Sequence, residues 1–161
     1  MANWDSLAYT QGAKVRATSE QPEWFSYTIT LPAGSALADE DELRFAVFGA
    51  NQKILAYSLG CDASIGTSNA DTADLVIGST VIDAAVETDG LAVADRAYTA
   101  NIAVAHVTAD GDILKLDTST ALDSQTSTGV RKITLAVLVA QQNAADAASG
   151  SLVKYASPYT L

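Results

Sequence analysis

Apolar and polar residues alternate with a period of two along much of this chain, and that pattern limits the possible fold more than any other feature. The clearest case is Arg131–Val139, where one side of the alternation consists of Ile133, Leu135, Val137 and Val139. The same pattern marks Ser26–Leu31, Leu43–Phe48 and Leu55–Cys61. In the second segment Leu43, Phe45 and Val47 share one side, and in the third the shared side begins with Leu55. Because successive side chains of a β-strand point to opposite faces, these four segments are predicted to be strands with one buried face.

Weaker strand patterns occupy Ala73–Ile77, Tyr98–Val107 and Ile113–Asp117, with turn signals such as Asp89-Gly90 between them. Two Ala-rich stretches, Asp83–Ala97 and Gln141–Ala148, are each expected to contribute no more than a short helix. Short strands separated by such turns predict an all-β fold, and the burial of one face per sheet favours a β-sandwich. The pattern does not fix the strand order, so a jelly roll and an immunoglobulin-like sandwich both stay open.

A chain of 161 residues is long enough for one domain with a sizeable core. The strand patterns place that sandwich domain at residues 26–140, between an N-terminal arm (1–25) and a C-terminal arm (141–161). Aromatic residues gather in and near these arms, and Trp and Tyr are common anchors of protein interfaces. The candidate interface residues are Trp4, Tyr9, Trp24, Phe25, Tyr155 and Tyr159. The arms either dock on neighbouring subunits or fold back over their own sandwich, or do both.

The charge balance limits the possible partners. Nineteen acidic and nine basic residues give a net charge of −10, which argues against nucleic-acid binding because that needs a positive surface. Residues 39–112 hold 13 of the acids and three of the bases, so this part is expected to face away from an acidic partner or a DNA-filled interior. No apolar run approaches 18 residues, and the N-terminal residues lack the basic and apolar regions of a signal peptide, so no membrane span and synthesis in a cytoplasm are expected.

The residues that might carry chemistry are expected to be structural. His106 lies in a strand-like stretch without a nucleophile motif, and Cys61 ends an apolar stripe and is interpreted as a small buried residue. The acidic run Asp39–Glu42 is interpreted as a solvated loop, in preference to a cation site or a glycosidase carboxylate pair. Asp110-Gly111 is interpreted as a hairpin turn in preference to a calcium loop. We therefore expect no catalytic site, no cofactor and no metal.

One stretch has a recognisable order of motifs. Ile29-Thr30-Leu31-Pro32-Ala33-Gly34-Ser35-Ala36-Leu37-Ala38 is followed by an acidic step, by Leu43–Phe48 and by Ala73–Gly78, and Ile133–Val139 closes the series. This order, over residues 26 to 140, resembles small structural proteins of tailed bacteriophages, several of which are jelly-roll cement or head-decoration proteins. The resemblance implies a jelly-roll-like β-sandwich with extended arms and a mechanical function. The two arms fall outside it.

The resemblance further implies a virion protein on the outer capsid surface that binds the major capsid protein. Such proteins often form trimers and stabilise a head by bridging capsomers, and they are made in the host cytoplasm. Two alternatives stay open. The same fold serves in tails, fibres or spikes as a glycan-binding adhesin, and a depolymerase would need a buried carboxylate pair that the sequence does not display.

Overall fold

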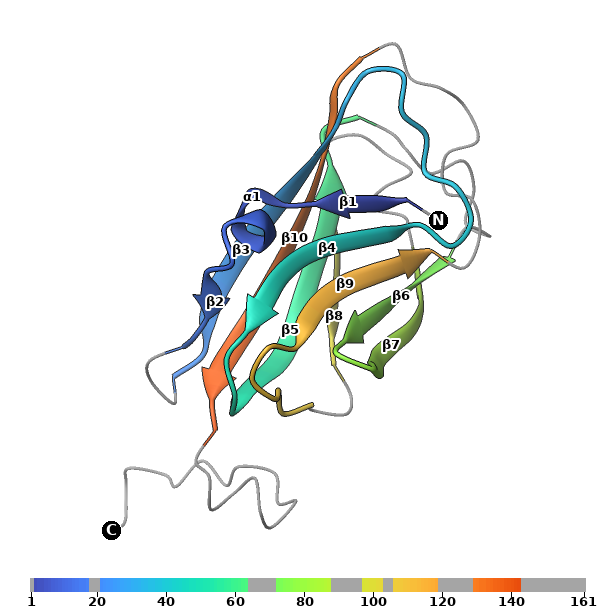
Figure 1. Ribbon diagram of the computed structural model, residues 1–161. Coiled ribbons are helices and arrows are strands. Elements are labelled where there is room, and N and C mark those ends of the chain that lie inside the picture. The colour runs from blue at the N-terminus through green and yellow to red at the C-terminus, as the bar shows by residue number, and fades with distance from the viewer. Residues whose placement is uncertain are drawn as a thin grey trace, which may run out of the picture.

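The computed structural model describes residues 2–17, 21–63, 72–87, 97–102, 106–118 and 129–142, which form two sheets. Sheet A runs in the order β1 (Asn3–Asp5), β4 (Glu42–Phe48), β9 (Ile113–Thr118), β6 (Thr72–Ile77) and β7 (Thr80–Glu87), and β2 (Lys14–Val15) also pairs with β4. Sheet B runs in the order β3 (Glu23–Leu31), β10 (Arg131–Gln141), β5 (Gln52–Cys61) and β8 (Ala97–Asn101). The two sheets lie face to face, with sheet A nearer the viewer in Figure 1.

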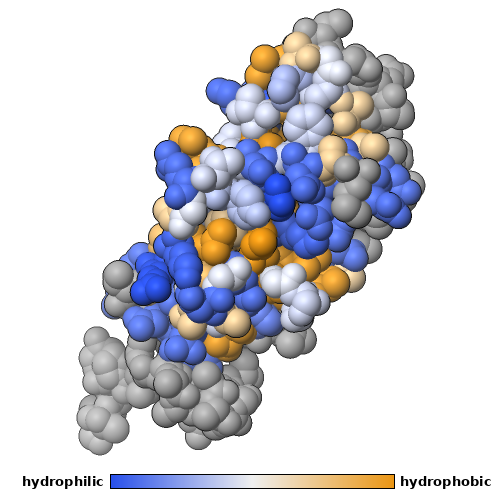
Figure 2. All heavy atoms as spheres, viewed as in Figure 1, coloured by the Kyte–Doolittle hydropathy of each residue, from blue (hydrophilic) through white to orange (hydrophobic). Residues whose placement is uncertain are grey.

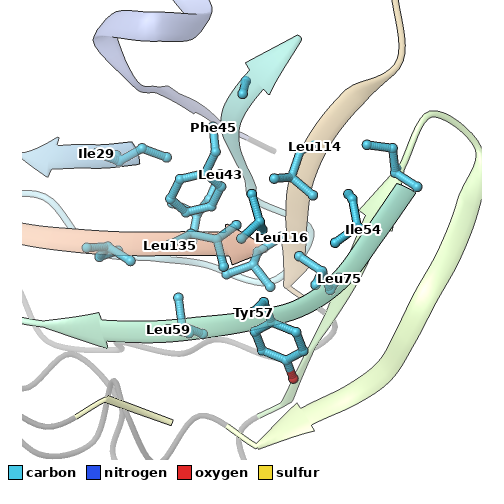
Figure 3. Close-up of a cluster of buried hydrophobic side chains, with 14 of the residues drawn as sticks. Ile29, Leu43, Phe45, Ile54, Tyr57, Leu59, Leu75, Leu114, Leu116 and Leu135 are labelled. Atoms are coloured by element: carbon cyan, nitrogen blue, oxygen red, sulfur yellow. The ribbon is translucent and has the colours of Figure 1, made fainter. Parts of the chain in front are cut away.

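The core fills the space between the sheets. Figure 3 shows Leu43, Phe45, Leu114 and Leu116 of sheet A packed against Ile29, Tyr57, Leu59 and Leu135 of sheet B. All of these side chains are at least 99% buried. The inward side chains are the ones that the period-two pattern places on one face, because burying that face removes the apolar stripe from water. The predicted all-β sandwich is therefore confirmed, and Cys61 is a buried core residue as expected.

Two β-bulges change the predicted faces of individual residues. The ladder between β4 and β9 shifts register between Arg44 and Ala46, and beyond that point Phe48 is buried while Val47 is not. The prediction that Val47 shares the inward face of Leu43 and Phe45 is therefore wrong. A bulge inserts one extra residue into a strand and so exchanges its two faces from there on. A second shift, opposite Leu138 and Val139 of β10, likewise leaves Leu55 partly exposed.

The segment around residue 83 also differs from its prediction. Residues 83–87 belong to β7, which pairs with β6 through a turn at Gly78 and Ser79, so this part of the Asp83–Ala97 stretch is a strand and not a helix. Residues 88–96 lie outside the described residues. Gly78 has a positive φ of 59°, and a Cβ at this position would lie 2.5 Å from an Asp112 carboxylate oxygen. The hairpin therefore needs glycine at this point. Strand β10 continues to Gln141, the first residue of the other stretch in which a short helix was expected, and residues 143–148 of that stretch lie outside the described residues.

The turn at Asp110-Gly111 exists, but the hairpin predicted for it does not. Val107 forms a bridge with Lys53 of β5 in sheet B, whereas β9 begins at Ile113 in sheet A. The chain thus crosses from one sheet to the other through this turn. Two main-chain hydrogen bonds fix the crossing, from the Phe48 N–H to the Asp112 carbonyl (2.8 Å) and from the Gly111 N–H to the Phe48 carbonyl (2.9 Å).

The N-terminal segment, residues 2–17, lies along the edge of its own sheet A. Strand β1 pairs in parallel with the first half of β4 and β2 pairs in parallel with its second half. Between them, Ser6 caps the four-residue helix α1 (Leu7–Thr10) by accepting a hydrogen bond from the Tyr9 N–H. Of the two arrangements considered for the N-terminal arm, this segment adopts the one that folds back onto its own sandwich. Strand β3 already begins at Glu23, within the expected arm, and Gln141 ends β10.

Candidate interaction surface

A buried carboxylate holds the N-terminal segment against the sandwich. Asp41 is 2% exposed, and its oxygens accept hydrogen bonds from the Ala2 N–H (2.5 Å), the Ala38 N–H (3.0 Å) and the Trp4 indole N–H (3.4 Å). The Asp41 N–H in turn donates to the Thr118 hydroxyl on β9 (2.9 Å). Three N–H donors satisfy the acceptor oxygens of this buried side chain. The interpretation of Asp39–Glu42 as a solvated loop is therefore wrong for Asp41, although Asp39 and Glu40 are exposed.

The outer face of sheet A carries a network of ion pairs. Arg44 of β4 binds both carboxylate oxygens of Asp5 on β1, at 2.7 and 2.9 Å, and lies 4.7 Å from the centre of the Tyr9 ring. The hydrogen bond to Asp5 raises the pKa of Arg44. Burial alone would lower the pKa of Lys115, but its contacts with Glu42 and Asp117 raise it. These charges already have partners within the chain, and bidentate pairs of this kind fix the strands in place.

Figure 2, drawn from the same side as Figure 1, shows hydrophobic residues in the middle of this face with hydrophilic residues around them. On this face, an apolar group consists of Val47, Ile113, Val76 and Val81. Val76 is only 7% exposed, whereas Val81 on the outermost strand is 49% exposed. We call this group the sheet A valine group. A shallow depression of about 270 Å³ adjoins it, lined by Glu42, Arg44, Gly78, Gly111, Asp112, Ile113 and Lys115.

The outer face of sheet B has a different chemistry. The outward positions of its strands β3, β10 and β5 carry uncharged and mostly small residues: Trp24, Ser26, Thr28, Thr30, Thr134, Ala136, Leu138, Ser58 and Gly60. Ala56 also lies on this side of β5 but is buried. We call this surface the neutral face. Across it, the hydroxyls of Thr28 and Thr134 are 3.0 Å apart and share a hydrogen bond. Two lysines, Lys132 and Lys53, lie at its opposite ends.

The predicted interface aromatics occupy different environments. Trp24 projects from β3 on the neutral face and is 54% exposed. Phe25 is on the opposite side of β3 and packs against the core, as does Trp4. Tyr9 is half-buried against Arg44. Tyr155 and Tyr159 lie outside the described residues. Trp24 is therefore the one residue of the described four that offers a large apolar surface to a partner.

Sequence reasoning missed three exposed apolar residues: Leu7 (70%), Val130 (58%) and Val81 (49%). Leu7 lies on α1, which contacts β3. The available signal was the Ser6 cap followed by a short run without alternation, which is too brief to identify a helix by its periodicity. Val81 lies next to the segment where a helix was expected, so its position on the outward face of a strand could not be inferred.

The other candidates for chemistry do not converge on a site. The His106 Nε2 lies 3.7 Å from an Asp112 carboxylate oxygen and has no hydrogen-bond partner. Within the described ranges, no three His, Cys, Asp or Glu side chains are grouped so as to hold a metal ion. The same part of the chain contains no helix long and apolar enough to span a membrane. In chemical terms, the described surface offers contact areas: one ionic face, one neutral face and an exposed tryptophan.

Comparison with known proteins gives a likeness in structure but not in sequence. No family model matches the chain, and no curated protein matches it. A chain in the structure of the capsid of Ralstonia phage GP4 superposes with a TM-score of 0.60 at 15% identity, covering 88% of this chain and 99% of that one. A chain in the capsid asymmetric unit of cyanophage Pam1 gives 0.54 at 11% identity, covering 80% and 91%. At these identities the likeness establishes a shared fold.

Proposed function

We propose that this protein is a non-enzymatic structural component of a bacteriophage virion, a jelly-roll-like cement or decoration protein of the head. The observation that carries the proposal is that nearly the whole length of two chains from phage capsid structures shares its fold. Such extensive coverage means that the likeness involves the complete sandwich and not a common substructure.

The surface chemistry supports the same function. A cement protein contributes by contact area, and an interface of standard size buries about 1,600 Å² and is repeated at every site of a shell. The neutral face offers a broad area of this kind, with an exposed tryptophan at its margin. In this proposal the protein binds the major capsid protein on the outer surface of the head and bridges neighbouring capsomers as a homo-oligomer, most simply a trimer. Trp24 and the candidate interface residues of the C-terminal arm, Tyr155 and Tyr159, contribute to these contacts.

The test uses heads purified without this protein. Purified full-length chain is added, capture is measured by co-sedimentation, and the temperature at which the heads release DNA is recorded. We expect saturable binding and a higher release temperature, and light scattering of the free protein should give the mass of three chains. Heads that neither bind the protein nor gain heat resistance would contradict the proposal. Binding to a glycan array without binding to heads would instead support a tail, fibre or spike adhesin.

A further inference from the structure

We infer that the neutral face, together with the free edge of β3, is the surface through which this protein binds an uncharged region of the shell protein. This inference rests on the proposed function and specifies which side of the sandwich faces the head. Three properties of the described residues carry it: the distribution of charge between the two outer faces, the open edge of β3, and the position of the exposed apolar side chains.

The two outer faces differ in the free energy needed to remove their polar groups from water when a partner binds. Covering sheet A would remove Arg44, Lys115 and their carboxylate partners from water, and desolvation of ion pairs often offsets what the contact provides. Covering the part of the neutral face between its two lysines removes hydroxyls, methyl groups and one indole, which cost less to desolvate than ion pairs when the partner supplies hydrogen bonds to the hydroxyls. The neutral face is therefore the side that an extensive interface can bury, and an uncharged partner surface is the one that complements it.

The edge of sheet B next to this face is open. Among the described residues, β3 pairs with β10 alone. Its nine residues contain one charged residue, Glu23 at the start, and no proline, and its ladder with β10 runs without a bulge. Proteins usually protect such edges with charges, prolines or bulges. Along β3 these devices are absent, although β1 and α1 of the same chain contact the strand. The unpaired main-chain groups of β3 can therefore accept a partner's extended segment where β1 and α1 leave them accessible.

An exposed apolar side chain lies at the same place. Trp24 projects from the outward face of β3 and is 54% exposed. Leu7 is also exposed, but its helix α1 contacts β4 of sheet A as well as β3, so Leu7 does not distinguish the two faces. Tryptophan is the residue most enriched at the energetic centres of interfaces. On sheet A, Val81 is exposed and Val47 and Ile113 are partly exposed, and four of the seven residues that line the adjoining depression are charged. The largest exposed apolar side chain, Trp24, thus favours sheet B.

Two matched substitutions test which outer face of the sandwich binds the head. Thr28→Glu places a carboxylate on the neutral face, and Val81→Glu places one on the opposite face. Both sites are exposed outward positions on the outermost strands of their sheets. Full-length wild type, both variants and Trp24→Ala are added to heads purified without this protein, and the dissociation constants are measured by co-sedimentation. Because an unpaired charge buried in an interface is costly, Thr28→Glu should weaken binding at least about tenfold, and so should Trp24→Ala. Val81→Glu should stay within about twofold of wild type.

Urea unfolding of each variant checks that the fold is intact. The binding results then distinguish a failure of the proposed function from a failure of the inference about the docking face. If wild type itself does not bind heads, the proposed function fails. If wild type binds and Val81→Glu abolishes binding while Thr28→Glu and Trp24→Ala do not, the docking face is sheet A and the inference is overturned. It is also overturned if Thr28→Glu leaves binding to heads unchanged and instead breaks the free oligomer, because the neutral face would then be occupied by a second copy of the chain.

Discussion

At the scale of single residues, Asp41 links three parts of the molecule through hydrogen bonds to Ala2, Trp4 and Ala38. Asp41→Asn replaces one acceptor oxygen with an NH₂ group that faces N–H donors. We expect the free energy of unfolding to fall by about 1–3 kcal/mol, the cost of leaving a buried polar group unsatisfied. Urea titration followed by tryptophan fluorescence measures it. The matched control is Asp39→Asn, which changes an exposed carboxylate two residues away and should have almost no effect. Equal effects of the two changes would contradict the role assigned to Asp41.

A second residue, Tyr27, makes the free energy of unfolding depend on pH in the alkaline range. Burial raises the pKa of the Tyr27 phenol above its ordinary value of 10.0. The unfolded chain therefore loses this proton first as the pH rises, so the contribution to stability is intact below pH 10 and is lost above it. Tyr27→Phe removes this loss. Between pH 9 and pH 11, the free energy of unfolding of the variant should fall less than that of wild type, by a difference on the order of 1 kcal/mol. Urea titrations at both pH values measure this difference. If wild type and Tyr27→Phe lose the same unfolding free energy between the two pH values, the pKa of Tyr27 is not raised in the fold.

At the scale of elements, β10 tests whether period-two alternation assigns the two faces. Leu135 points into the core and is fully buried, whereas Leu138, three residues along the same strand, lies on the neutral face. Leu135→Ala should destabilise the protein by about 2–5 kcal/mol because it leaves a cavity. Leu138→Ala should cost less than about 1 kcal/mol because its side chain is already partly in contact with water. Thermal and urea unfolding of both variants give the comparison, and a larger effect at Leu138 would reverse the assigned faces.

The elements that the sequence predicted well are those whose alternation is long and unbroken. Segments Ser26–Leu31 and Arg131–Val139 became β3 and β10, which pair without a register shift. The faces of Val47 and Leu55 could not be predicted because a bulge depends on the register of two strands distant in sequence. Strands β1 and β2 escaped detection since they have three and two residues, too few for a period. Strand β7 was hidden by an Ala-rich composition that is typical of helices.

The candidate surface was predictable only in part, because the pairing of strands distant in sequence decides which side chains are exposed. Aromatic residues near the chain ends indicated an interface, but the sequence cannot tell which face of a strand its neighbours cover. Trp24 and Phe25 are adjacent in the sequence, yet one is exposed and the other packs against the core. The contrast between the ionic and neutral faces needed the pairing of β10 with both β3 and β5, which places residues more than 70 positions apart side by side.

At the scale of the whole molecule, a net charge of −10 coexists with the neutral face, whose only charged residues among the described positions of β3, β10 and β5 are the lysines at its two ends. If that face binds the head, the contact contains few ionic interactions and salt should have little effect on it. We expect the dissociation constant to change less than about threefold between 50 mM and 500 mM NaCl, because screening acts on charges and leaves apolar contacts nearly unchanged. Co-sedimentation over a salt series provides the measurement. A steep loss of binding with salt would indicate that the ion pairs of sheet A face the shell.

The orientation of the sandwich on a head tests the account most directly. An image reconstruction of heads saturated with the full-length protein would locate both sheets relative to the shell. The account predicts that β3, β10 and β5 lie against the capsid protein with Trp24 in the contact, while Arg44 and Lys115 on sheet A face away from the shell. A reconstruction with the ion pairs of sheet A against the shell and Trp24 exposed to solvent would contradict it.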